Sequence, residues 1–126
     1  MAEFYYPELS KLILDSAYKV HTELGPGLLE STYETCLEYE LINCNCKVNR
    51  QVALPVTYRG LILPEGYRID LWVENKIVIE LKSVEILADV HFKQLLTYLR
   101  LSQCKVGYLI NFNVASLKEG IVRKVM

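Results

Sequence analysis

The sequence has no long hydrophobic run. Its apolar stretches, such as residues 77–79 and 108–110, are far too short to cross a bilayer, which takes about 20 apolar residues in a helix. The first residues also lack the basic start and long apolar segment of a secretory signal. We therefore expect a cytoplasmic protein with no membrane partner.

An excess of positive charge is missing as well. The 14 Lys and Arg residues face 15 Asp and Glu residues, which gives a formal net charge of −1. A protein that holds duplex nucleic acid over much of its surface normally carries an excess of cations. Any contact with nucleic acid must therefore come from a local patch.

Paired cysteines at metal-binding spacing are also absent. The four cysteines are Cys36, Cys44, Cys46 and Cys104, and no two of them form a C-x-x-C pair. Zinc and iron–sulfur sites usually take their ligands from such pairs on tight loops. Free thiols are the expected state.

Apolar residues, in contrast, are plentiful. They make up 52% of the 126 residues, which is enough for a sizeable core in one globular domain over residues 1–126. Helical spacing of apolar residues predicts helices over residues 9–24, 28–43 and 88–102. Alternating or continuous apolar residues predict strands over 51–58, 61–63, 67–73, 77–82, 105–111 and 120–125, with residues 64–66 ending the short second strand. This order predicts an α/β fold in which a helix joins two parallel strands.

Three charged residues stand where core strands are expected to be apolar. Asp70 lies within residues 67–73, and Glu80 and Lys82 lie within residues 77–82. Side chains alternate between the faces of a strand, so Glu80 and Lys82 share one face. If residues 74–76 form a three-residue loop, Asp70 falls opposite Glu80, whereas a two-residue loop would put it on the other face.

Two close carboxylates beside a lysine are open to two interpretations. A hard divalent cation such as Mg²⁺ or Mn²⁺ would relieve their repulsion, and the lysine could stabilise negative charge on a phosphate. Alternatively, the three residues form an ordinary cross-strand charge cluster on a solvated face. Spacing alone does not decide between them.

Asp70 followed by Glu80-Leu81-Lys82 on the next strand resembles the PD-(D/E)XK nuclease superfamily. That superfamily has an α-β-β-β-α-β core, a mixed central sheet flanked by helices, and the element order predicted above matches it. The chain also resembles the GxxExxY proteins, a bacterial branch of the superfamily, through Gly27-Leu28-Leu29-Glu30-Ser31-Thr32-Tyr33. The resemblance extends from about residue 10 to residue 125.

The resemblance implies a role for each matched residue. Asp70 and Glu80 would bind the metal together with the carbonyl of Leu81, and Lys82 would be the catalytic lysine. Glu30 would supply the helix carboxylate that many of these nucleases direct at the metal, although a carboxylate in the first turn of a helix is favourable in any protein.

A Gln-x-x-x-Tyr element follows the Glu-x-Lys strand, as in recombination-type exonucleases of the superfamily. Gln94 and Tyr98 would lie on one helical face and could bind a water or phosphate, or they could form a polar stripe on a core helix. His21 is expected to be a packed or surface residue, and Tyr33 a core aromatic with a hydrogen-bonded hydroxyl.

Together these features predict a Mg²⁺- or Mn²⁺-dependent nuclease that acts on DNA. Phosphate contacts could come from the cations Lys47, Arg50, Arg59, Arg68 and Lys93. Any sequence specificity could come from a homodimer or a protein partner, because a separate DNA-binding domain does not fit in this length. The alternative is a nuclease fold that serves as a catalytically idle binding or assembly module.

Overall fold

The computed structural model describes residues 4–126. Two helices, α1 (Pro7–Leu24) and α2 (Glu30–Asn43), precede the three strands β1 (Val48–Tyr58), β2 (Leu61–Val73) and β3 (Ile77–Lys82). Helix α3 (Asp89–Ser102) then leads to β4 (Val106–Asn111), a short 3₁₀ helix, η1 (Leu117–Gly120), and β5 (Ile121–Val125). This element order confirms the α/β fold class expected for a PD-(D/E)XK-like core.

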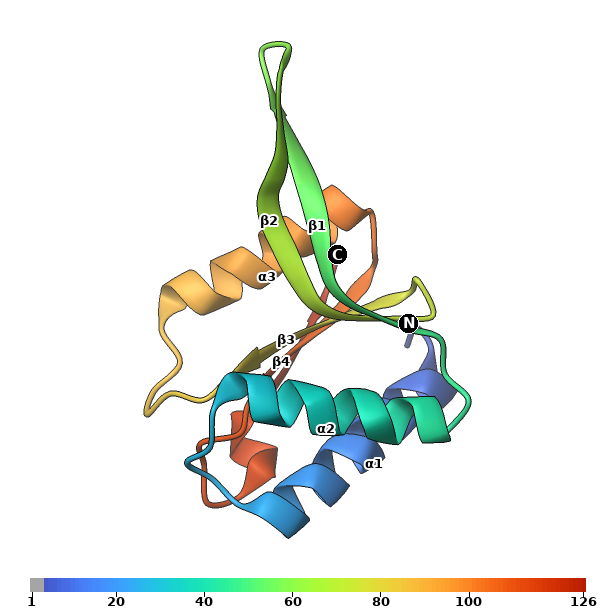
Figure 1. Ribbon diagram of the computed structural model, residues 1–126, viewed down its shortest axis with the longest axis vertical. Coiled ribbons are helices and arrows are strands. Elements are labelled where there is room, and N and C mark those ends of the chain that lie inside the picture. The colour runs from blue at the N-terminus through green and yellow to red at the C-terminus, as the bar shows by residue number, and fades with distance from the viewer. Residues whose placement is uncertain (1–3) are drawn as a thin grey trace.

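The five strands form one mixed sheet in the order β1-β2-β3-β4-β5. Only β3 and β4 are parallel, and α3 connects them, as the sequence pattern predicted. Helices α1 and α2 cover one face of the sheet and α3 covers the other (Figure 1). No helix within residues 4–126 is long and apolar enough to cross a membrane.

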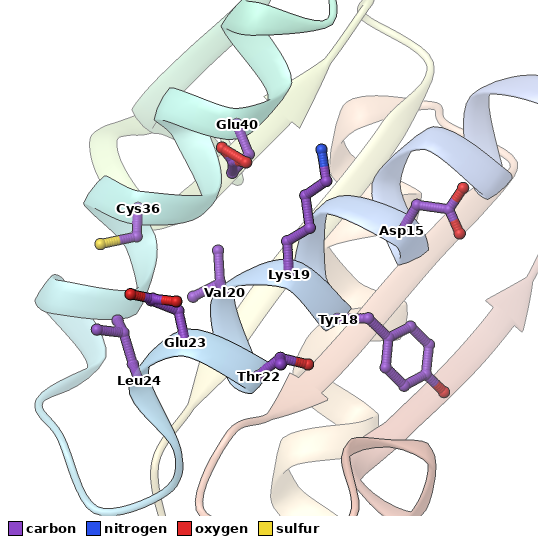
Figure 2. Close-up of a pocket in the computed structure, with 9 residues that line it drawn as sticks. All are labelled: Asp15, Tyr18, Lys19, Val20, Thr22, Glu23, Leu24, Cys36 and Glu40. Carbon is purple, nitrogen blue, oxygen red and sulfur yellow. The ribbon is translucent and has the colours of Figure 1, made fainter.

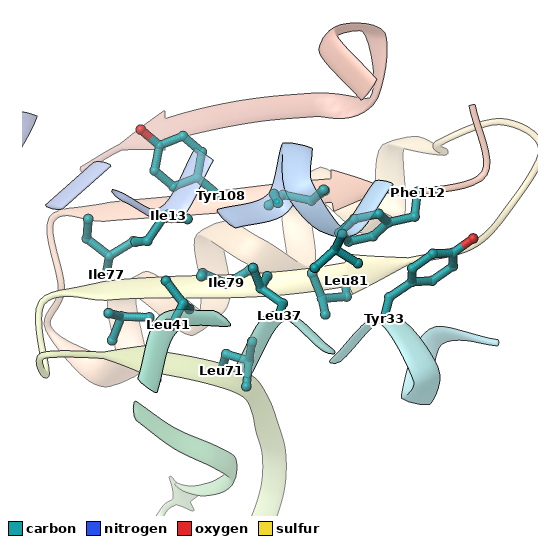
Figure 3. Packing of buried hydrophobic residues seen from close by; sticks show 14 of the residues in the cluster. Ile13, Tyr33, Leu37, Leu41, Leu71, Ile77, Ile79, Leu81, Tyr108 and Phe112 are labelled. Carbon is teal, nitrogen blue, oxygen red and sulfur yellow. The ribbon is translucent and has the colours of Figure 1, made fainter. Parts of the chain in front are cut away.

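Each face of the sheet has its own hydrophobic core. On the α1/α2 face, Ile77, Ile79 and Leu81 of β3 pack against Ile13 and Leu37 (Figure 3). On the α3 face, the apolar cluster includes Val78, Leu95 and Leu99. The sheet is therefore buried on both sides at β3, and any charged side chain on this strand lies in an apolar environment.

The strand prediction was wrong at residues 61–66. Residues 61–73 form one continuous strand, and the β1–β2 hairpin extends beyond the rest of the molecule as a long arm (Figure 1). The pairing shifts between Leu54↔Tyr67 and Val56↔Leu63, which leaves Pro64 in an irregular stretch. Proline is tolerated at such a bulge because its missing N–H has no ladder partner there.

Tyr33 fixes the turn between α1 and α2. Its ring is fully buried and stacks on Phe112 at a centroid distance of 4.4 Å. Its hydroxyl donates to the carbonyl of Gly25 (2.5 Å) and accepts from the backbone N–H of Leu28 (3.1 Å). This confirms the expected core aromatic with a hydrogen-bonded hydroxyl. These two hydrogen bonds also hold the segment before α2 against Tyr33, and α2 begins directly after it at Glu30.

The Tyr33 hydroxyl can be tested by Tyr33→Phe. The variant leaves the carbonyl of Gly25 and the N–H of Leu28 without their partner, so we expect the free energy of unfolding to fall by about 1–2 kcal/mol. Urea denaturation measures this loss. Tyr39→Phe, on the same helix but 65% exposed, is the matched control and should unfold as the wild type does. Equal stability of both variants would refute a structural role for the Tyr33 hydroxyl.

Candidate functional site

The turn between β2 and β3 decides how Asp70 and Glu80 meet. Val73 pairs with Ile77 across a turn of three residues, 74–76, which confirms the predicted loop length. The ladder continues to Leu71↔Ile79 and the paired residues end there. Asp70 and Glu80 occupy the next position, where β2 turns away to follow β1 and β3 continues beside β4.

At this fork, side chains replace the backbone ladder. The N–H of Asp70 donates to Oε1 of Glu80 (3.1 Å), and the N–H of Leu81 donates to Oδ2 of Asp70 (2.8 Å). Each carboxylate therefore bonds to the backbone of the opposite strand. These reciprocal bonds hold the two acidic side chains close together.

Burial dominates the electrostatics of the pair. Glu80 is only 4% exposed, and burial followed by the nearby Asp70 raises the pKa of Glu80 to about 9. Burial also raises the pKa of Asp70 to about 6, although the hydrogen bond from Leu81 acts in the opposite direction. In the metal-free protein at neutral pH, Glu80 consequently holds a proton, which avoids two adjacent buried negative charges.

Lys82 is half-buried at the end of the same strand. Because Ile77, Ile79 and Leu81 fill the α1/α2 core, strand alternation puts Lys82 on the α3 face with Glu80. Its positive charge lowers the pKa of both Asp70 and Glu80, so it lies close enough to act on them. The structure thus brings Asp70, Glu80 and Lys82 together.

Glu30 occupies a different position from this pair. It is exposed in the first turn of α2, and its Oε2 accepts from the N–H of Ser83 (3.3 Å), directly after Lys82. Within residues 4–126, no group of three or more His, Cys, Asp or Glu side chains is arranged to hold a metal. A direct ligand role for Glu30 therefore remains a prediction from resemblance.

Glu34, one helical turn beyond Glu30, was not predicted from the sequence. Glu34 is 6% exposed, and its negative charge raises the pKa of both Asp70 and Glu80. Spacing offered one signal, because Glu30, Glu34 and Glu38 follow one another at intervals of four residues on one face of α2. Gln51 of β1, which lies between Glu34 and Asp70, was also missed, and no local pattern marked it.

Helix α3 brings Tyr98 to the site. Burial, followed by the negative charges of Glu80 and Asp70, raises the pKa of Tyr98 well above its usual value. Its ring meets Tyr67 edge-on at 5.6 Å. Gln94 lies one turn earlier on α3 and is half-buried. Roles for both residues in binding water or phosphate stay predictions.

The cations proposed for phosphate contact differ in availability. Arg50 pairs with Glu34 (2.6 Å) and Glu38 (3.4 Å), and Arg68 pairs with Glu65 (3.2 Å). Lys47, Arg59 and Lys93 are exposed. Arg59 lies at the tip of the hairpin arm, and Lys93 lies on α3.

Other residues singled out in the sequence are structural. Nε2 of His21 lies 2.8 Å from the carbonyl oxygen of Val114, and its ring is 6.3 Å from Phe112, so this histidine is packed, as expected. The four cysteines are free.

A groove of about 760 Å³ lies between α1 and α2 (Figure 2). Lys19 and Glu40 are among the residues that line it, whereas Asp70, Glu80 and Lys82 are not.

A family model described as the PD-(D/E)XK nuclease superfamily matches residues 7–124. The chain belongs to this superfamily. No curated protein and no solved structure matches the chain.

PD-(D/E)XK nucleases generally use divalent metal ions and act on nucleic acid. Asp70 and Glu80-Leu81-Lys82 are the residues that we predict to supply the acidic residue and the Glu-x-Lys tripeptide of the pattern. The similarity to the GxxExxY branch rests on the Gly27–Tyr33 motif, in which Tyr33 and the start of α2 have the structural role described above.

The raised pKa of Glu80 predicts how stability depends on pH without metal. The folded protein binds this proton more tightly than the unfolded chain, so stability should fall as pH rises from about 4.5 to about 9. Glu80→Gln stays neutral and should be more stable than the wild type at pH 8, by up to about 5 kcal/mol. The two proteins should unfold alike near pH 4.5.

Denaturation in the presence of a chelator at both pH values measures this difference. Glu85→Gln, at an exposed position after β3, is the control and should not change stability at either pH. A Glu80→Gln variant less stable than the wild type at pH 8 would contradict the assigned buried proton.

Proposed function

We propose that this protein is a Mg²⁺- or Mn²⁺-dependent nuclease that hydrolyses phosphodiester bonds in DNA. The observation that carries the proposal is the Asp70–Glu80 pair at the β2–β3 fork, with Lys82 beside it, in a chain of the PD-(D/E)XK superfamily. Ionising both carboxylates of this buried pair costs free energy in the metal-free protein, and a bound cation would offset that cost.

The donor set suits a hard cation. Asp70, Glu80 and the carbonyl of Leu81 offer oxygen ligands only, on adjacent strands. Mg²⁺ is usually held by one or two carboxylates and keeps several of its waters, so it does not require a third protein carboxylate. Zinc would prefer His and Cys ligands. We therefore assign Asp70, Glu80 and Leu81 as the metal ligands, with Glu30 as a candidate for contact through water.

A bound Mg²⁺ or Mn²⁺ would supply Lewis-acid activation at the scissile phosphate. The chain's own contribution is orientation and charge. The N–H of Leu81 fixes one oxygen of Asp70, and the N–H of Asp70 fixes one oxygen of Glu80. The ammonium of Lys82 would bind a non-bridging phosphate oxygen and stabilise its developing negative charge. Gln94 and Tyr98 on α3 would bind the phosphate or a water on the same side.

Metal binding is tested with Asp70→Asn. Mg²⁺ or Mn²⁺ should raise the thermal unfolding midpoint of the wild type, since ligand at 100 times its Kd adds about 2.7 kcal/mol to the stability of the folded state. Asp70→Asn should lose this gain, because one carboxylate of the pair is removed. Asp89→Asn, exposed at the start of α3, should keep it. A metal response in Asp70→Asn equal to that of the wild type would place the ion elsewhere.

Catalysis is tested with Lys82→Ala. Both carboxylates stay in place, so metal binding should survive, whereas cleavage of DNA should fall about a hundredfold or more because a positioned charge is lost. Lys118→Ala, exposed on η1, should cleave as the wild type does. Cleavage is measured on single-stranded DNA, duplex DNA and RNA.

Two results would overturn the nuclease proposal. Wild-type protein that cleaves none of the three substrates would favour the idle binding module, and the acidic composition already gives that alternative some support. Equal cleavage by Lys82→Ala and the wild type would show that the activity comes from a contaminant.

A further inference from the structure

Gln51 has an unusual backbone conformation for a residue in the middle of a strand. Its φ of +53° lies in the left-handed region, which is uncommon for a residue other than glycine. The neighbouring pairs Arg50↔Leu71 and Val52↔Ile69 are both in register, so the distortion is confined to Gln51. By that register Gln51 lies opposite Asp70. Local backbone strain of this kind persists only where the surroundings enforce it, and it concentrates at functional sites.

The distortion directs the Gln51 amide to two carboxylates. Its Nε2 donates to Oε1 of Glu34 (2.6 Å) and to Oδ1 of Asp70 (3.2 Å). The side-chain amide nitrogen has two hydrogens, and both are used. Oδ2 of Asp70 is already held by the N–H of Leu81, so Gln51 fixes the remaining oxygen. The orientation of the Asp70 carboxylate is consequently set from two sides.

Glu34 is the anchor of this arrangement. It is buried in α2, and its Oε2 accepts from Nε of Arg50 at 2.6 Å. The guanidinium balances the charge of Glu34, so this carboxylate needs no metal ion as a partner. Gln51 therefore separates two acidic groups with different partners, since Glu34 is paired with Arg50 and Asp70 accepts from the backbone N–H of Leu81.

We propose that Gln51 is a positioning residue, which holds the Asp70 carboxylate in the orientation that binds a divalent cation and keeps Glu34 out of that site. The inference rests on the proposed metal-dependent function of the Asp70–Glu80 pair. Partners of a metal ligand in the outer shell typically change metal affinity or activity by about 10- to 100-fold when they are removed. A merely structural link between α2 and β2 would instead change the stability of the metal-free protein.

Two variants separate these roles. Gln51→Leu keeps the size of the side chain but removes the amide. Gln51→Gly removes the side chain and adopts a left-handed φ without strain, so relief of the backbone offsets the lost hydrogen bonds. Asn49→Gly is the matched control, because Asn49 is also an exposed residue of β1 and lies two residues before Gln51.

The Kd for Mn²⁺ is measured by isothermal titration calorimetry, and the unfolding midpoint in chelator is measured for the same proteins. We expect Gln51→Leu and Gln51→Gly to bind Mn²⁺ about 10- to 100-fold more weakly, while the metal-free Gln51→Gly protein unfolds close to the wild-type midpoint. Asn49→Gly should bind Mn²⁺ as the wild type does. If Gln51→Leu does not fold, the affinity of Gln51→Gly decides the matter.

The outcomes distinguish this inference from the proposed function. Wild-type affinity in Gln51→Gly, with Asp70→Asn unable to bind, would overturn the positioning role and leave the metal site intact. A large loss of stability in Gln51→Gly without any loss of affinity would likewise show a structural link only. A wild-type protein that does not bind Mn²⁺ at millimolar concentration would overturn both.

Discussion

The separation of β2 from β3 after the Leu71↔Ile79 pair is the constraint on which the site depends. Beyond this point β2 follows β1 into the hairpin arm, while β3 runs on beside β4 (Figure 1). A fork in a sheet leaves backbone N–H groups without ladder partners, and buried N–H groups must find acceptors. The carboxylates of Asp70 and Glu80 are those acceptors, so the same bonds that close the fork also assemble the acidic pair.

Placing the carboxylates of Asp70 and Glu80 at the fork has an electrostatic cost that the rest of the structure only partly offsets. Glu80 lies in the apolar interior between two helical layers, where its charged form is poorly solvated. Lys82 favours the charged forms, whereas Glu34 opposes them. The free protein is therefore strained electrostatically at this fork, and a cation bound between the strands would relieve the strain. That expectation links the burial of the pair to the proposed metal-dependent chemistry.

Helix α2 and the residues just before it connect this fork to the remaining fold in two places. At its start, Tyr33 closes the preceding turn, and Glu30 and Leu28 accept hydrogen bonds from Ser83 at the end of β3. One turn later, Glu34 reaches Asp70 through Gln51. Glu30 and Glu34 thus stabilise the surroundings of the site, and the first turn of the helix cannot shift without moving the end of β3.

The sequence by itself determined what depends on short-range geometry. The alternation of side chains along β3 and a loop of three residues were enough to place Asp70, Glu80 and Lys82 on one side of the sheet, because Asp70 and Glu80 are only ten residues apart in one hairpin. The same holds for the element order and for the parallel β3–β4 pair joined by α3.

Only the tertiary structure decided which distant residues support the site. Glu34, and not Glu30, is linked to Asp70 because of how α2 is rotated against the sheet. The sequence spacing alone does not distinguish these two glutamates, because they lie on the same face of the helix. The contact of Gln51 with Asp70 depends on the β1–β2 register, which runs past an irregularity at Leu54 and Val56, and on a left-handed backbone that sequence does not encode locally. Pro64 signals a break, yet the strand continues because the bulge removes the need for its N–H. Local hydrogen-bond geometry is encoded residue by residue, whereas helix rotation and strand register are set by packing of the whole core.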